Sequence, residues 1–174
     1  GVTACVLGYA DSEVNKAVNQ AIIKGSMGTL NSYEEVQLAE KLISLHPWSE
    51  MARFAKTGGE ACSIAVRIGR AASGKDKVAF CGYHGWHDWY LSSNLKNKKN
   101  LEDQLLPDLN PTGVPKNLND TSLPFKFNDF DSFDSLIEDN KNKIGTIIME
   151  PQRRGEPPQD GFLKHVKETA RKIG

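Results

Sequence analysis

The sequence predicts an α/β protein with a largely parallel sheet and helices on both of its faces. Two apolar segments, VAFC at residues 78–81 and IGTIIME at 144–150, have the length of strands and are separated by helical patterns. A third, MARFA at residues 51–55, precedes the turn signal TGGE and is also expected to be a strand. Strands that alternate with helices form βαβ units, in which the strands run parallel.

Helices are predicted where apolar side chains recur at three- and four-residue spacings. They are expected over residues 11–25, 32–45, 60–72 and 130–141 and after residue 161. Asp11 is a possible N-cap of the first helix, and Ser32 opens a capping-box pattern in front of the second. After residue 90 the periodicity is lost and prolines are frequent, so we expect an excursion over the surface or a functional loop.

Composition and charge disfavour several classes of function. The 174 residues carry 22 basic and 22 acidic side chains, a balance that argues against binding to nucleic acid or to an anionic membrane. No apolar run approaches the roughly 20 residues of a membrane-spanning helix, and the first residues lack the basic region of a signal peptide. The three cysteines are odd in number and far apart, which indicates reduced thiols in a cytoplasmic protein.

A possible anion site follows the segment 51–55, where the sequence KTGGE leads into a helix. Helix N-termini present unpaired N–H groups and a positive dipole end, and two glycines let the backbone approach an anion closely. The sequence therefore predicts a phosphate-binding turn at Thr57, Gly58 and Gly59, with the threonine adding a hydroxyl. A tight connection between strand and helix, which would need the same glycines, is the alternative.

An aromatic and polar segment, CGYHGWHDWY at residues 81–90, lies at the carboxyl end of the preceding strand. Ligands of open α/β sheets bind at such strand ends, and flat aromatic faces suit stacking on a planar ring. Two alternatives remain open. One is a zinc site formed by Cys81, His84 and His87, with Asp88 next to them in the sequence. These residue types bind zinc, although their spacing differs from common zinc motifs. The aromatic side chains would otherwise pack against the core or a neighbouring subunit.

Glu150 ends the strand predicted at 144–150. Because parallel strands end at the same edge of a sheet, we expect this carboxylate, the turn at 56–60 and the loop at 81–90 to meet at one edge. An ordinary surface carboxylate at a strand end is the alternative.

Four short motifs, in this order, resemble those of the class III aminotransferases, the pyridoxal phosphate (PLP) family that includes glutamate-1-semialdehyde aminomutase. They are KTGGEA at 56–61, YHG at 83–85, EP at 150–151 and GFL at 161–163. The corresponding family motifs are N-S-G-T-E-A, tyrosine or phenylalanine followed by His-Gly, E-P and G-F-L. Upstream, LGYADSEVNKAV at 7–18 is similar to another family pattern, so the resemblance covers essentially the whole chain.

The resemblance implies a PLP-dependent transferase of fold type I, with a cofactor site that includes Thr57, Gly58, Gly59, Tyr83, His84 and Glu150. By the same resemblance, the turn at 57–59 would hold the PLP phosphate, Glu60 would brace that turn, and Tyr83 would stack on the pyridine ring. His84 would shape the loop beneath the cofactor. Glu150 corresponds to the glutamate of the E-P motif, whose role is more structural.

The chain also departs from the family pattern. Lys56 replaces the usual asparagine and Gly59 the usual threonine, which removes one hydroxyl from the phosphate site and adds a positive charge nearby. The family's asparagine or glutamate near the phenolic oxygen of the cofactor has no clean counterpart. Arg153, Arg154 and Glu156 are loose candidates for that region.

The resemblance implies that residues 1–50 lead into the large domain and that residues 51–174 form part of it. The chain starts without methionine and stops within a helical pattern, so we expect a fragment of a longer protein. The aspartate that pairs with the ring nitrogen and the lysine that binds PLP covalently belong to family motifs absent from this chain. No catalytic residue is therefore assigned.

The implied activity is transfer of an amino group, between two small amine and carbonyl substrates in an aminotransferase or within one substrate in an aminomutase. The resemblance also implies a homodimer. A non-catalytic domain that binds an anion or a partner is the alternative that the residues leave open.

Overall fold

The computed structural model describes residues 4–25, 27–104, 106, 108–153 and 155–174. By its internal contacts the chain divides into two units, Gly1–Arg53 and Phe54–Gly174, which are described separately. Among the described residues no helix is long and apolar enough to cross a membrane.

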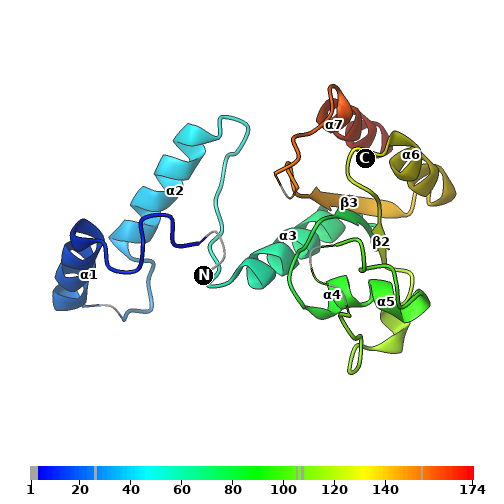
Figure 1. The fold of residues 1–174 in the computed structure, drawn as a ribbon. Helices are drawn as coiled ribbons and strands as arrows, with labels where there is room; N and C mark the ends of the chain where they lie inside the picture. Colours follow the sequence, from blue (N-terminus) through cyan, green and yellow to red (C-terminus); the bar gives the residue numbers. More distant parts are fainter. Residues whose placement is uncertain (1–3, 26, 105, 107, 154) are drawn as a thin grey trace. The chain divides into compact units, whose positions relative to one another are not determined.

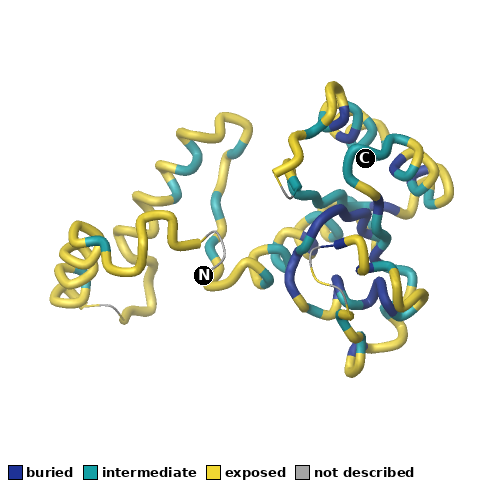
Figure 2. Tube along the Cα trace, viewed as in Figure 1, coloured by how far each residue is buried: buried dark blue, intermediate teal, exposed yellow. Residues whose placement is uncertain are grey.

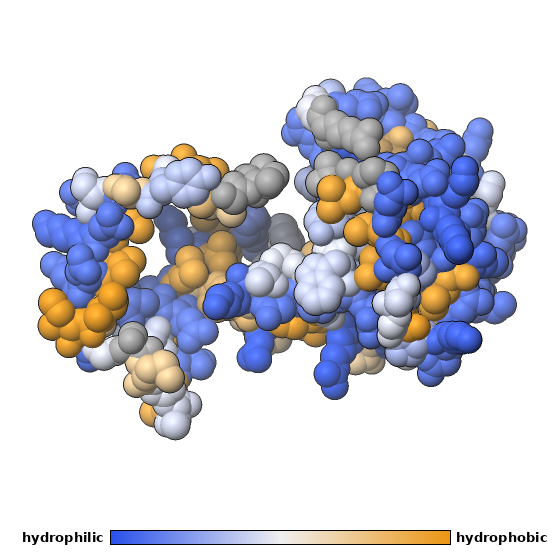
Figure 3. All heavy atoms as spheres, turned by 60° about the horizontal axis from the view of Figure 1, so that its bottom comes forward, coloured by the Kyte–Doolittle hydropathy of each residue, from blue (hydrophilic) through white to orange (hydrophobic). Residues whose placement is uncertain are grey.

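The first unit contains α1 (Ser12–Lys24) and α2 (Tyr33–Leu45), which confirms both predicted helices. Each begins at a side-chain cap: Asp11 accepts a hydrogen bond from the Val14 N–H at 3.0 Å, and Ser32 accepts one from the Glu35 N–H at 3.2 Å. No described residue of either helix is buried (Figure 2). Apolar side chains therefore lie at the surface of this unit (Figure 3).

The second unit is built on a parallel sheet. Among the described residues it has three strands, β1 (Lys77–Cys81), β2 (Ser122–Pro124) and β3 (Ile144–Met149), in the order β2-β1-β3 (Figure 1). The central strand β1 pairs in parallel with both neighbours, so that Ala79 lies opposite Leu123 on one side and Ile147 on the other. The predicted α/β class and parallel sheet are confirmed.

Helices cover both faces of this sheet, as predicted (Figure 1). Val78 and Phe80 of β1 pack with α3 (Gly58–Ser73) and with α4 (Asp88–Leu91). Ala79 and Cys81, which point the other way, pack with α6 (Phe130–Asp139) and α7 (Phe162–Ile173). Because side chains alternate along a strand, β1 is buried from both sides and its carboxyl end is fixed in the core.

The predicted strand at residues 51–55 is wrong. This segment forms no strand, and the division between the two units falls within it, after Arg53. A strand exists only where a neighbouring backbone takes its hydrogen bonds, and among the described residues the sheet pairs β1, β2 and β3 alone.

The stretch after residue 90 is less irregular than expected. It contains α5 (Ser93–Lys96), the short 3-10 helix η1 (Lys116–Leu118) and the strand β2, and irregular structure is confined mainly to the residues between α5 and η1. A three-residue strand that ends in proline is too short to show the alternation by which strands are recognised.

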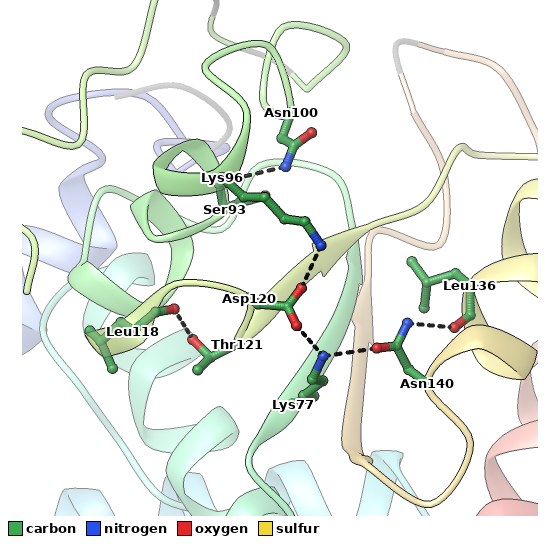
Figure 4. Close-up of polar contacts among 9 residues, drawn as sticks. All are labelled: Lys77, Ser93, Lys96, Asn100, Leu118, Asp120, Thr121, Leu136 and Asn140. Carbon is green, nitrogen blue, oxygen red and sulfur yellow. Dashed lines mark hydrogen bonds and ion pairs between the residues drawn. The ribbon is translucent and has the colours of Figure 1, made fainter. Parts of the chain in front are cut away.

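A polar cluster ties several of these elements together at the amino end of the sheet (Figure 4). Asp120, just before β2, accepts hydrogen bonds from Lys77 of β1 at 2.5 Å and from Lys96 of α5 at 3.0 Å. Lys77 also donates to the side-chain oxygen of Asn140, the C-cap of α6, at 2.9 Å. The two lysines hold the pKa of Asp120 below its usual range.

Asp120→Asn is expected to destabilise the protein by about 1 kcal/mol at pH 7, a modest value because the Asp120 side chain is 38% exposed. The folded-state pKa is lowered, so the contribution of the carboxylate is complete above its unfolded pKa of about 3.9 and is lost as the pH falls through the folded value. The difference between variant and wild type in urea unfolding should therefore shrink below about pH 4.

Glu138→Gln is the matched control, because its pair with Lys141 is exposed at both ends. It should leave the unfolding free energy nearly unchanged. A difference for Asp120→Asn that stays constant between pH 7 and pH 3 would contradict the assignment.

Candidate functional site

The amino end of α3 carries the predicted anion-binding turn. Thr57 is its N-cap: the Thr57 hydroxyl accepts the Glu60 N–H at 3.3 Å, and the Glu60 carboxylate accepts the Thr57 N–H at 2.9 Å. The same carboxylate oxygen also accepts the Lys56 N–H at 3.1 Å. This capping box holds the turn rigidly, as the predicted bracing role of Glu60 requires.

The capping box leaves two backbone donors available. The N–H groups of Gly58 and Gly59, in the first turn of α3, find no acceptor among the described residues. The Thr57 N–H holds the pKa of Glu60 below its usual value, so this carboxylate stays ionised and stays on the cap. The turn thus offers adjacent N–H donors at the positive end of a 16-residue helix.

The loop after β1 lies directly against this turn. The backbone of Gly85 approaches so closely that a Cβ atom there would lie 2.8 Å from the Cα of Gly59. The same loop also contacts Gly59 through His87, because a Cβ on Gly59 would lie 3.0 Å from Cδ2 of the His87 ring. The structure therefore brings together parts of the turn at 56–60 and of the loop at 81–90, which the sequence predicts to meet at one edge of the sheet.

Tyr83 is half-buried in this loop, and its ring meets Tyr90 edge-on at a centroid distance of 5.9 Å. Its backbone N–H donates to Oε1 of Glu150 at 3.1 Å, so the predicted third member of the site also lies here. The preceding N–H, that of Gly82, donates to Oε1 of Gln104 at 2.7 Å. The Tyr83 backbone is thereby fixed relative to β3.

His84 is buried and supports the loop from inside. Its Nε2 lies 3.1 Å from the carbonyl oxygen of Cys81, and its Nδ1 lies 4.0 Å from Sγ of Cys62. Burial lowers the pKa of His84, so the ring is neutral at pH 7 and its single N–H can donate to the Cys81 carbonyl. This arrangement matches a loop-shaping role better than one in proton transfer.

The zinc alternative finds no support. The Cys81 side chain is fully buried beneath the sheet end, and this burial raises the pKa of its thiol to about 11. His87 lies against Gly59, and Asp88 begins α4. Across the described part of the chain, no three His, Cys, Asp or Glu side chains come together as a possible metal site.

The family model of the class-III aminotransferases matches residues 1–174, the full length of the sequence. The chain belongs to the class-III aminotransferase family. Its fold is also that of the solved transaminases. An omega-transaminase from Sphaerobacter thermophilus superimposes with a TM-score of 0.83 at 27% identity, over 99% of this chain and 41% of the other.

Curated members of the class-III aminotransferase family include close sequence relatives. The 3-aminobutyryl-CoA aminotransferase of Cloacimonas acidaminovorans is 35% identical over 173 residues, which are 95% of this chain and 37% of the relative. The glutamate-1-semialdehyde 2,1-aminomutase of Methanococcus maripaludis (strain C6) is 34% identical over 174 residues, 97% of this chain and 40% of the relative. The chain therefore spans about 40% of the length of these relatives.

Two residues of this candidate site were missed by the sequence analysis or assigned only loosely. Gln104, buried in the stretch expected to be irregular, holds the Gly82 N–H. Arg153 approaches Glu150, with Nε 3.4 Å from Oε2. No motif marks Gln104, because its contact joins segments 22 residues apart. Of the other loose candidates, Glu156 binds the Asn128 side chain and Arg154 lies outside the described residues.

Proposed function

We propose that this chain is the part of a PLP-dependent enzyme that binds the cofactor phosphate and ring, and that the enzyme transfers amino groups as an aminotransferase or aminomutase. The observation that carries the proposal is the direct contact between the amino end of α3, at Gly59, and the loop that carries Tyr83. Anion donors and an aromatic face are what a phosphorylated pyridine needs side by side.

The residues present fit a phosphate group. Gly58 and Gly59 offer adjacent N–H donors, and the Thr57 hydroxyl keeps its own proton for donation because its oxygen accepts from Glu60. Within the described part of the chain, nothing lies within 4 Å of a Cβ built on Gly58, so the turn is not crowded on that side. Lys56 adds a positive charge beside the turn, where the family pattern has asparagine.

The residues of the loop fit a planar ring. The Tyr83 ring is braced edge-on by Tyr90, and its backbone is held by Glu150, so one aromatic face is presented in a fixed position. His84, neutral and buried, supports the same loop. When bound, PLP supplies an electron sink for the carbon that carries the amino group. The chain itself would bind the phosphate and orient the ring.

Further features of the whole protein are also proposals. The resemblance to the family supports a homodimer that acts on small amines and carbonyl compounds. The three free cysteines, of which Cys81 is buried, support a cytoplasmic location. The lysine that binds PLP covalently and the aspartate at the ring nitrogen would lie in family segments other than residues 1–174.

The proposal is tested on the full-length protein. It should bind one PLP per subunit, with an absorption band between roughly 330 and 430 nm that shifts when an amino donor is added. A full-length protein that binds no PLP under these conditions would contradict the enzymatic function and favour a non-catalytic domain that binds an anion or a partner.

A further inference from the structure

Two consecutive backbone N–H groups in the loop after β1 are held by side chains from two other segments. Gln104, only 2% exposed, accepts the Gly82 N–H, and Glu150, at the end of β3, accepts the Tyr83 N–H. The fit is close: a Cβ on Gly82 would lie 2.6 Å from Cγ of Glu150, and Gly82 has a φ of 108°. The position of Tyr83 therefore depends on where Glu150 is held.

Arg153 connects these two supports. Its Nε lies 3.4 Å from Oε2 of Glu150, the oxygen that Tyr83 does not use, and its Nη2 donates to the carbonyl oxygen of Asp103 at 3.1 Å. Asp103 precedes Gln104 in the sequence, so these contacts form a closed ring that starts and ends at the loop after β1. We call this arrangement the Arg153 brace; it comprises Gly82, Tyr83, Asp103, Gln104, Glu150 and Arg153.

Burial makes the arginine hard to replace. The Arg153 side chain is 11% exposed and that of Glu150 is 32% exposed, so the ion pair is partly shielded from water and salt. Only a guanidinium can face the carboxylate through Nε while Nη2 reaches the backbone of another segment. Without it, the Glu150 carboxylate gains by turning toward water, and the Tyr83 N–H loses its acceptor.

We propose that Arg153 is a positioning residue: through Glu150 it fixes the backbone of Tyr83 and hence the aromatic face offered to the cofactor ring. The orientation of the cofactor ring by Tyr83 rests on the proposed function. The fixing of the Tyr83 backbone through Glu150 is a property of the protein without cofactor. The charge of Arg153 thus acts through Glu150.

The first test is amide hydrogen exchange in the cofactor-free, full-length protein. In Arg153→Met, exchange of the Gly82 and Tyr83 amides should be about tenfold faster than in wild type, while exchange within α6 should be unchanged. Arg153→Lys should give a smaller acceleration, because it keeps the charge but not the bond to Asp103. Lys164→Met is the matched control; it removes an exposed pair with Glu168 within α7 and should change neither segment.

In a Glu150→Met background, adding Arg153→Met should accelerate these amides little further, since the arginine acts through the glutamate. If Arg153→Met also speeds exchange within α6, the fold has loosened. The exchange of the Gly82 and Tyr83 amides in Arg153→Lys, compared with wild type, then tests the proposal. Unchanged exchange of Gly82 and Tyr83 in the variant with an intact α6 would overturn the proposal.

The second test is the binding of PLP. Arg153→Met should weaken PLP affinity about fivefold and reduce the circular dichroism of the cofactor band, because the ring is held less firmly. Faster exchange with unaltered affinity and dichroism would also overturn the positioning role. Failure of the wild type to bind PLP would contradict the proposed function, and the exchange data would still decide whether Arg153 fixes the loop.

Discussion

Gly58→Asp is expected to weaken PLP binding by at least about tenfold, or about 1.4 kcal/mol, without destabilising α3. The substitution places a carboxylate in the first turn of the helix, where the phosphate would be bound. A Cβ atom at this position meets no described atom within 4 Å, so the fold has room for a side chain and the added charge is expected to dominate the effect. A negative charge in the first turn also favours the helix through its dipole, so the fold should be kept.

Gly58→Asn is the matched control, with nearly the same shape and no charge. It should lose much less affinity than Gly58→Asp, as measured by equilibrium titration with PLP and by thermal unfolding of both variants. Gly59→Asp should weaken binding as well, but less cleanly, because its Cβ would crowd the His87 ring. Equal PLP affinities for Gly58→Asp and wild type would contradict the assignment of the phosphate site to this turn.

Gly85→Ala is expected to destabilise the protein by roughly 2–3 kcal/mol and to lower PLP affinity together with stability. Gly85 has a φ of 99°, which disfavours any side chain, and its Cβ would lie 2.8 Å from a backbone atom of Gly59 that cannot rotate away. The loop must therefore move off the amino end of α3. Tyr83 and the phosphate turn would then separate.

Gly113→Ala provides the control for backbone strain alone. Gly113 has a comparable φ of 91°, but nothing lies within 4 Å of its Cβ position in the described part of the chain. It should cost about 1 kcal/mol of stability and leave PLP affinity unchanged. If the two variants had the same effect on PLP binding, the contact between Gly85 and Gly59 would not matter for the site.

The sequence was sufficient to predict the elements that show strong local patterns. The short apolar run of β1, the caps of α1 and α2 and the glycine-rich start of α3 are short-range signals, and the structure confirms the elements they predict. The apolar run at residues 51–55 predicts a strand that the structure does not contain. Strand formation depends on a neighbour that no local signal supplies.

The inner supports of the candidate site could not be predicted in the same way. Gln104 comes from a stretch with no periodicity and reaches Gly82 only because that stretch folds back over β1. Arg153 is one of two adjacent arginines, and nothing in their order shows which of them faces Glu150. The roles of Thr57, Gly58, Gly59, Tyr83, His84 and Glu150 in holding a cofactor stay predictions.

A crystal structure of the full-length protein with PLP would test the central claim most directly. The phosphate should lie within hydrogen-bonding distance of the Gly58 and Gly59 N–H groups, with the Thr57 hydroxyl beside it and the pyridine ring facing Tyr83. A phosphate bound elsewhere, with the amino end of α3 making no contact to it, would contradict the assignment of this turn and loop as the cofactor site.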